Sequence, residues 1–342
     1  MRKSAEKPAL VPVRVPAEWE AHACIWTCWP SHPELWAGDL LEEARTQIAG
    51  MVKTLAEGDK VKVLAYGNEA FNSAMKALGP TAKVIKAKFG DIWLRDTGPI
   101  FATLNGKPAA LRFRTNGWGQ KYIYEFDDQV GDAVAEGSGI PITRNDFIVE
   151  GGALEHDGQG TLLTTKQCLL NKNRNTGWSQ EKIEDALRHM LGAKKVLWLG
   201  EGMINDHTDG HIDNIARFVA PGVVVCQSPT GKNDPNTKIF DDIASALEKM
   251  TDATGKKLEV IRIPSPGLVK DDSGDIIPAS HMNFIIGNKT VAVPTYGTPS
   301  AARAVADLQD LFPKHKVVGL PSNAVLTGGG SFHCITQQEP KL

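Results

Sequence analysis

Apolar residues recur along the chain with the spacing of amphipathic helices. Ile183, Ala186, Leu187 and Met190 fall on one helical face and precede Gly192, which suits a helix C-terminal cap. Similar stretches start at intervals of 52 to 61 residues. The five stretches begin near Glu69, Asp127, Ser179, Lys238 and Pro299. Helices are therefore expected at these five places.

A short β-prone run follows each of these helices, and a polar cluster follows each run. The runs are 83–86, 140–143, 195–199, 258–263 and 316–320. The clusters are 93–96, 150–152, 211–213, 281–283 and 333–334. Five similar modules that place polar groups at corresponding points predict a ring with a central site. An ordinary α/β domain with evenly spaced elements would give the same pattern, so the period alone does not decide the fold.

Another helix, 39–57, and a strand, 61–65, are expected before this series. Asp39 and Glu42 have the spacing of a capping box, and Gly79 stands where the next helix should end. No linker rich in Pro, Gly or Ser divides the chain, so residues 1–342 are expected to form a single domain.

Composition excludes several classes of function. Lys plus Arg is 38 against 40 for Asp plus Glu, a net charge of -2, which gives no reason to expect nucleic acid or an anionic membrane as partner. The charged, Pro-broken N-terminus does not resemble a signal peptide, and no apolar run approaches the ~20 residues that cross a bilayer. Five cysteines without CxxC spacing argue against disulfides and favour a cytoplasmic protein.

The segment 328–334, GGGSFHC, holds the first candidate for chemistry. Its three glycines allow a close approach to a ligand, and Cys334 follows them as a candidate nucleophile. No GK[ST] follows, so this is not a phosphate-binding loop. Free cysteines are more often buried small apolar residues. That structural interpretation is preferred for Cys24, Cys28, Cys168 and Cys226, with Cys168 and Cys226 in strand-like runs.

Three other clusters supply a histidine and carboxylates. His211 and Asp213 are two residues apart, so on a strand both side chains would project from the same face. Glu150 ends an apolar run just before two glycines. Asp96 follows Arg95 and precedes a Gly-Pro turn, and a structural Arg95–Asp96 ion pair is the preferred role for Arg95.

A metal site is not expected. His207 and Asp209 stand near the histidine cluster, but the chain has no HExxH motif and no clustered cysteine ligands. The remaining set is one thiol, one histidine and three carboxylates. Excess negative charge around a nucleophile suits a planar cation, and a guanidinium matches carboxylates with its fork of N–H donors. Its resonance-stabilised carbon needs a strong nucleophile such as a thiolate, whose pKa the bound cation would help to lower.

An ordered set of motifs identifies a family. The chain resembles agmatine deiminases, within the guanidine-modifying group that includes arginine deiminases, bacterial peptidylarginine deiminases and amidinotransferases. The resemblance covers almost the whole chain. The motifs are PAEWEAH (16–22), WLRDTGP (93–99), NGWGQKY (116–122), EGGALEHDGQGTLLTT (150–165), CLLNKNRN (168–175), GHIDN (210–214), VPTYG (293–297) and GGGSFHCITQQ (328–338).

This resemblance implies a five-bladed pseudo-symmetric α/β propeller (pentein) of ββαβ modules. It implies Cys334 as nucleophile, His211 as general acid and base, and Glu150 as the acid that orients and charges the histidine. Asp96 and Asp213 correspond to the carboxylates that grip the guanidinium. Residues expected to line the substrate channel are Trp93, Asn116 and Trp118.

The implied reaction has two halves and needs no cofactor. Cys334 adds to the guanidinium carbon, and His211 protonates the departing ammonia. Water activated by His211 then hydrolyses the S-alkylthiouronium. Agmatine would give N-carbamoylputrescine, an intermediate of putrescine biosynthesis.

Departures from the family pattern concern the substrate. Relatives often read GGGNIHC where this chain has Ser331 and Phe332, and the typical ASY-x-N segment reads ASHMN at 279–283. Many relatives carry an acid four residues before the catalytic histidine, where this chain has His207. The nearby carboxylates expected to meet a substrate ammonium are Asp206 and Asp209.

Four alternatives stay open. A peptidylarginine deiminase would need a mouth that admits a protein chain, and an amidinotransferase would transfer the amidino group to an amine. A cysteine protease would use Cys334 and His211, but three carboxylates suit an oxyanion poorly. A non-catalytic binding module would have no reason to keep the whole set together. The sequence also leaves open whether the chain forms a homo-oligomer.

Overall fold

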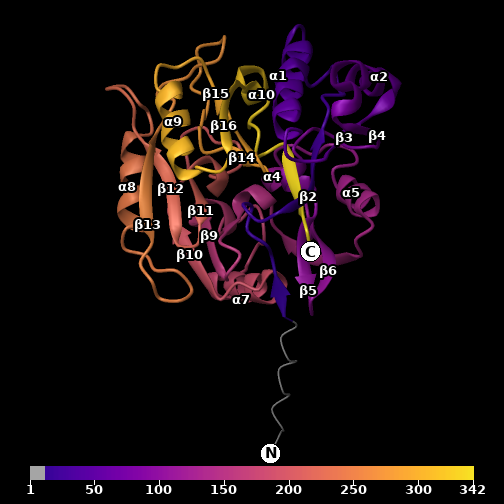
Figure 1. Cartoon of the computed structure of the whole chain (residues 1–342). Coiled ribbons are helices and arrows are strands. Elements are labelled where there is room, and N and C mark those ends of the chain that lie inside the picture. The colour runs from indigo at the N-terminus through magenta and orange to yellow at the C-terminus, as the bar shows by residue number, and fades with distance from the viewer. Residues whose placement is uncertain (1–11) are drawn as a thin grey trace, which may run out of the picture.

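A computed structural model describes residues 12–342 as a mixed α/β structure with five separate sheets (Figure 1). The first sheet contains β1 (Val13–Arg14), β5 (Ile100–Leu104), β6 (Lys107–Arg114) and β7 (Ile142–Ile148). The second contains β10 (Lys195–Leu199), β9 (Thr161–Thr165) and β8 (Glu155–His156). The third contains β11 (Ala216–Ala220), β12 (Val223–Ser228) and β13 (Glu259–Pro264). The fourth contains β14 (Ile285–Ile286), β15 (Thr290–Thr295) and β16 (Lys316–Pro321). The fifth contains β17 (Thr336–Pro340), β2 (His22–Cys28), β3 (Val61–Ala65) and β4 (Lys83–Lys86).

The sheets share one internal pattern, an antiparallel pair followed by a helix and a parallel strand. β5 and β6 pair antiparallel and β6 and β7 parallel, and the same order recurs in the other four sheets. The helices between the parallel strands are α1 (Leu40–Leu55), α5 (Val130–Ser138), α7 (Gln180–Leu191), α8 (Thr237–Leu247) and α9 (Ala301–Leu311). The ββαβ repeat expected from the family resemblance is therefore present in each sheet.

The fifth sheet differs from the others in two ways. Its antiparallel partner β17 comes from the C-terminal end of the chain, and in Figure 1 this yellow strand lies beside β2. An extra helix, α2 (Gly67–Leu78), leads to an extra parallel strand, β4. The periodic series predicted from the sequence began with this extra helix, whereas the corresponding helix of the repeat is α1.

Most predicted elements are confirmed, with two local corrections. Strands 61–65, 83–86 and 195–199 have the predicted bounds. The strand predicted at 140–143 instead begins at Ile142, because α5 ends at a left-handed Gly139 and the chain then passes through Pro141. The capping box is wrong, since Asp39 has helical dihedrals (φ -74°, ψ -13°) and makes no side-chain cap bond.

Each main helix reaches a neighbouring sheet. α7 contacts β1, α8 contacts β10, α9 contacts β13, and α1 contacts β15 and β16. The Trp26 ring of β2 lies against Gly137 of α5, whose carbonyl accepts a hydrogen bond of 3.1 Å from Lys62. Between residues 12 and 342, no helix is both long and apolar enough to cross a membrane.

Candidate active site

The predicted polar clusters follow the last parallel strand of each sheet, and side chains from several of them converge at one point. Gly152 marks this point. A methyl group on it would lie 2.6 Å from Nδ1 of His211, 2.9 Å from Oδ1 of Asp96 and 3.0 Å from Oδ2 of Asp213. Any side chain there would displace these three groups. Cys334, His211, Glu150, Asp96 and Asp213 are called the reactive cluster below.

Cys334 lies within the cluster with only 4% of its surface exposed. Its Sγ is 3.0 Å from Nδ2 of Asn283 and 3.5 Å from Oδ2 of Asp213, and its backbone N–H donates to Oδ1 of Asn283 at 3.2 Å. Burial, and then the charges of Asp213 and Asp96, raise the pKa of this thiol well above its ordinary 9.0. Without a cation beside it, the sulfur is therefore a neutral thiol near pH 7.

The two carboxylates beside the thiol are held by different partners. Asp96, in the short helix α3 (Leu94–Thr97), accepts hydrogen bonds of 2.8 Å from the Gly152 N–H and from Nε1 of Trp118. Burial raises its pKa. Asp213 accepts a 2.8 Å bond from Nδ1 of His333 at Oδ2, while its Oδ1 has no partner between residues 12 and 342.

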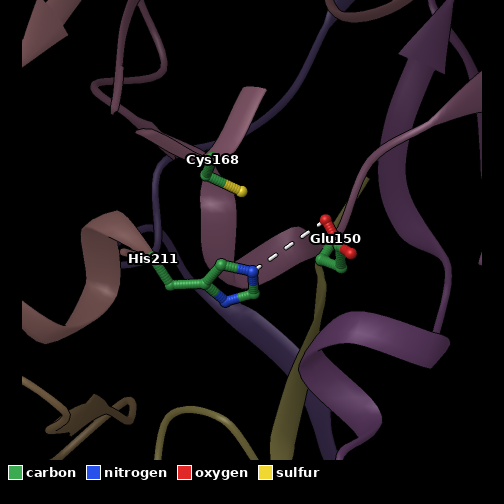
Figure 2. Close-up of side chains that lie close together, drawn as sticks. All are labelled: Glu150, Cys168 and His211. Carbon is green, nitrogen blue, oxygen red and sulfur yellow. Dashed lines mark ion pairs between the residues drawn. The ribbon is translucent and has the colours of Figure 1, made fainter. Parts of the chain in front are cut away.

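His211 does not lie on a strand, contrary to the prediction. It precedes a 3-10 turn, η3 (Ile212–Asn214), and that turn carries Asp213 back toward the same point. The His211 ring is fully buried, with Nδ1 3.8 Å from Asp96 and Nε2 3.9 Å from Glu150 (Figure 2). Burial opposes a positive charge, but Asp96, then the Cys168 sulfur and the Glu150 carboxylate, raise the pKa of His211 well above its ordinary 6.5. The ring is therefore placed to be an imidazolium.

Glu150 is shared between His211 and a residue that sequence reasoning missed. Nε of Arg174 donates to the two Glu150 carboxylate oxygens at 2.9 and 3.3 Å. Arg174 also donates to the Thr208 carbonyl at 2.8 Å and pairs with Asp209. Arg174 lies in the CLLNKNRN motif. The signal in the sequence that could have identified it is a basic residue in a segment rich in asparagine.

Cys168 lies in the helix α6 (Lys166–Leu169), not in a strand, and faces the histidine (Figure 2). Atoms of Glu150, Cys168 and His211 that could bind a metal lie within 4.8 Å of one another. A metal would need a thiolate and a neutral imidazole. Burial instead raises the pKa of Cys168, the acids favour a protonated His211, and Glu150 is paired with Arg174. The group fits an imidazolium better than a metal ion.

A cavity of about 230 Å³ leads to the thiol. Aromatic side chains form much of its wall, namely those of Trp36, Trp93, Trp118, Tyr122 and Tyr124. The other lining residues are Leu35, Asp91, Asp96, His207, Thr208, Thr327, Gly328, Gly329 and Cys334. The triple glycine lets the indoles approach, because a methyl group on Gly328 would lie 2.8 Å from Trp36 and 2.9 Å from Trp93.

Three residues predicted to bind substrate do not line this cavity. Asn116 caps the turn of α4 (Gly117–Gln120) and bonds to the Asn173 carbonyl. Asp206 accepts from the Thr208 N–H at 2.8 Å, and Asp209 is bonded to Lys121 at 2.6 Å and to Asn173 at 2.9 Å. All three side chains support loops around the site.

The predicted Arg95–Asp96 ion pair is wrong. Arg95 extends away from Asp96, and its Nε donates to the His333 carbonyl at 3.3 Å. Asp96 bonds instead to groups that face the cavity, as described above. The arginine therefore supports the loop that carries the thiol.

A second buried ionic group lies behind the reactive cluster. It consists of Glu18, Glu155, Arg217 and His333, called the anchor cluster here. Arg217 pairs with Glu18 and, at 2.8 Å, with Glu155. Nε2 of His333 lies 3.0 Å from Glu18 and its Nδ1 2.8 Å from Asp213, so this ring connects the two clusters. Sequence reasoning assigned no role to any anchor residue.

Comparisons with known proteins point to one family. The family model for Porphyromonas-type peptidyl-arginine deiminase matches residues 14–340. The agmatine deiminase of Pseudomonas aeruginosa (strain LESB58) is 36% identical over 351 residues, covering 96% of this chain and 95% of that protein. The structure of Enterococcus faecalis agmatine deiminase, described as catalysing its reaction, matches with a TM-score of 0.91 at 34% identity, covering 99% of this chain and 100% of that one.

A further structure is the C. jejuni agmatine deiminase in a cysteine-to-serine variant with substrate bound. It matches with a TM-score of 0.89 at 27% identity over 99% of each chain. The resemblance predicted from the ordered motifs is confirmed. The chain belongs to the family of agmatine deiminases and Porphyromonas-type peptidyl-arginine deiminases.

Proposed function

We propose that the protein is an agmatine deiminase that converts agmatine and water to N-carbamoylputrescine and ammonia. The observation that carries this proposal is the position of the Cys334 thiol at the end of an aromatic cavity, beside Asp96 and Asp213, which form no ion pair with Lys or Arg in residues 12–342. A guanidinium supplies the missing positive charge and places its carbon at the sulfur. The activity named for the relatives with 36% and 34% identity supports the same choice.

In the proposed reaction, the free Oδ1 of Asp213 and the carboxylate of Asp96 hold the guanidinium. Its charge offsets that of the acids, lowers the pKa of Cys334 and leaves a thiolate close to the carbon. Addition breaks the planar resonance, and His211 protonates the departing nitrogen, which leaves as ammonia. His211, now neutral, takes a proton from water as the water attacks the thiouronium carbon, and Cys334 leaves.

Glu150 and Arg174 have a supporting role in this scheme. Glu150 favours the protonated form of His211, and Arg174 limits the net negative charge that Glu150 brings into the buried site.

We further propose that the five sheets form a closed five-bladed propeller in a single domain. Its support is the cycle of helix contacts, in which each helix reaches a neighbouring sheet and the last connection returns to the first. A cytoplasmic location is proposed from the five free cysteines.

The direct test is ammonia release from agmatine, arginine and a blocked arginyl peptide by the wild-type chain and by Cys334→Ala. Release from agmatine alone, lost in the variant, is the expected result. Release from the peptide or arginine alone would keep the chemistry and contradict agmatine as substrate. A folded wild-type chain that acts on none of the three would contradict the enzyme assignment and favour a binding module.

A further inference from the structure

The cavity contains two acids, and they lie at opposite ends of one indole ring. A methyl group on Gly330 would lie 2.8 Å from Cζ3 of Trp93 and 3.1 Å from the sulfur of Cys334, so that edge of the indole borders the thiol. At the other end, Nε1 of Trp93 donates to Oδ2 of Asp91 at 2.8 Å. Asp96 lies near the thiol, at one end of the Trp93 ring. Asp91 lies at the other end of the ring, about one indole length from the thiol. This span is of the same order as an extended four-carbon chain.

Asp91 is 5% exposed and lines the cavity. Its Oδ1 accepts the backbone N–H of Ile92 at 2.8 Å and Nε1 of Trp36 at 3.1 Å. Between residues 12 and 342, no Lys or Arg forms an ion pair with it. Burial raises its pKa, although the indole and backbone donors act in the opposite direction. A cation in the cavity would relieve the cost of this buried negative charge.

Aromatic rings line the cavity near Asp91, whose carboxylate accepts hydrogen bonds from two of them. The Trp36 and Trp93 rings are 6.4 Å apart between centroids, and Tyr122 and Tyr124 also line the wall. Aromatic faces attract alkylammonium groups and cover the methylenes that lead to them. Asp206 and Asp209, the acids expected from the sequence to do this, are bonded to Thr208, Lys121 and neighbouring loops instead.

We propose that Asp91 binds the terminal ammonium of the substrate and so sets the preference for a guanidine that carries a second cation four carbons away. This inference rests on the proposed agmatine deiminase function. The ammonium would approach Oδ2 of Asp91, which accepts a single hydrogen bond, from Trp93. Trp36 and Trp93 would enclose the alkyl chain.

The test compares agmatine with n-butylguanidine, which has the same carbon chain and no ammonium, in wild type and Asp91→Asn. Asn keeps the shape and the acceptor for Ile92 and Trp36 but removes the charge and places an NH2 group against the Trp93 N–H, a loss that affects both substrates alike. We expect kcat/KM for agmatine to fall about 10- to 100-fold. The value for n-butylguanidine should fall at least about threefold less, since that substrate has no charge to lose at this site and shares only the effect of the altered Trp93 contact. A proportional loss on both substrates would show that Asp91 only positions the indoles and would overturn the inference.

Asp127→Asn is the matched control. Asp127 accepts the N–H groups of Gly90 and Asp91 at 3.1 and 3.3 Å, but it does not line the cavity. Burial raises its pKa to about 7, so an uncharged amide is a mild replacement. This variant should keep the wild-type ratio of the two kcat/KM values, whereas a ratio that falls as in Asp91→Asn would assign the effect to the loop. A wild-type chain inactive on both substrates would contradict the proposed function itself, a result that does not involve Asp91.

Discussion

The reactive cluster and the anchor cluster are both buried groups of acids around a histidine, yet their charges are balanced differently. In the anchor cluster, Arg217 pairs with Glu18 and Glu155, and His333 adds a second donor to Glu18. In the reactive cluster, no Lys or Arg between residues 12 and 342 pairs with Asp96 or Asp213. Asp96 accepts hydrogen bonds from an amide and an indole, with the His211 ring 3.8 Å away. Asp213 bonds to His333 through one oxygen, and its other oxygen has no partner in the same residues.

This difference separates stability from binding. Removing one partner of a buried ion pair leaves an uncompensated charge and destabilises the fold. A buried acid that lacks a cation already carries that cost in the free protein, and a cationic ligand relieves it. The anchor cluster should therefore determine whether the chain folds, and the reactive cluster whether it binds and reacts.

The largest effect should come from His211→Asn, which removes the proposed proton donor. We expect kcat/KM for agmatine to fall about 10²- to 10⁴-fold. The free energy of unfolding should fall less than in Arg217→Met, because the His211 ring lies 3.8 and 3.9 Å from Asp96 and Glu150 and makes no hydrogen bond with any residue from 12 to 342. Ammonia assays and urea unfolding measure the two quantities. A variant that unfolds readily would show that His211 stabilises the fold as the anchor cluster does, and it would contradict the difference drawn between the two clusters.

Arg217→Met should show the opposite pattern. It leaves Glu18 and Glu155 buried without their cation, and the free energy of unfolding should fall by about 3–5 kcal/mol. The folded fraction should keep a KM for agmatine close to wild type. The matched control is Arg262→Met, which breaks a more exposed pair with Asp241 and should cost at most about 1 kcal/mol. Equal losses in the two variants would contradict the anchor role.

The pH dependence of thiol alkylation tests the uncompensated charge directly. Because burial, Asp213 and Asp96 raise the pKa of Cys334, its thiolate appears only as pH rises. The rate with neutral chloroacetamide should increase about tenfold per pH unit between pH 7 and 9. Cationic chloroacetamidine should react faster at pH 7, because its charge offsets the acids.

Cys334→Ala provides the background for this measurement, since the other four cysteines do not line the cavity. A chloroacetamide rate that is already constant at pH 7 would mean that the free protein holds a thiolate. The acids of the reactive cluster would then be compensated without substrate.

The smallest effect should follow His333→Gln, at the junction of the two clusters. Glutamine can donate to Asp213 or to Glu18 but cannot bridge both as the ring does. We expect a loss of about 1–3 kcal/mol in stability and about tenfold in kcat/KM. The ammonia assay measures kcat/KM, and urea unfolding measures stability. A loss in only one of these two quantities would show that the His333 ring supports one cluster alone.

Sequence reasoning located the reactive cluster but not what supports it. Periodic apolar residues and ordered motifs were enough for the main helices, the parallel strands and the grouping of Cys334, His211 and Glu150 at one place. The first module was assigned wrongly because its antiparallel partner is β17, near the other end of the chain. Local periodicity cannot reveal a pair so distant in sequence.

The supporting residues were missed for a related reason. Arg174, Arg217 and Glu18 are ordinary charged residues in sequence, and only their burial and mutual distances reveal their role. The same limit applies to Asp206 and Asp209, whose charges suggested ammonium binding although loop contacts already occupy them. Charge is visible in a sequence, but compensation of charge is a property of the folded chain.

The pairing of β17 with β2 has a consequence for the order in which the site forms during synthesis. Thr336 pairs with Thr27, and Cys334 stands just before this last strand. A ribosome releases the acid-bearing loops, the imidazole and the aromatic wall before it releases the sulfur, and early segments begin to fold first. A chain released only as far as residue 333 therefore carries the acids, the imidazole and the aromatic wall of the site without the sulfur of Cys334.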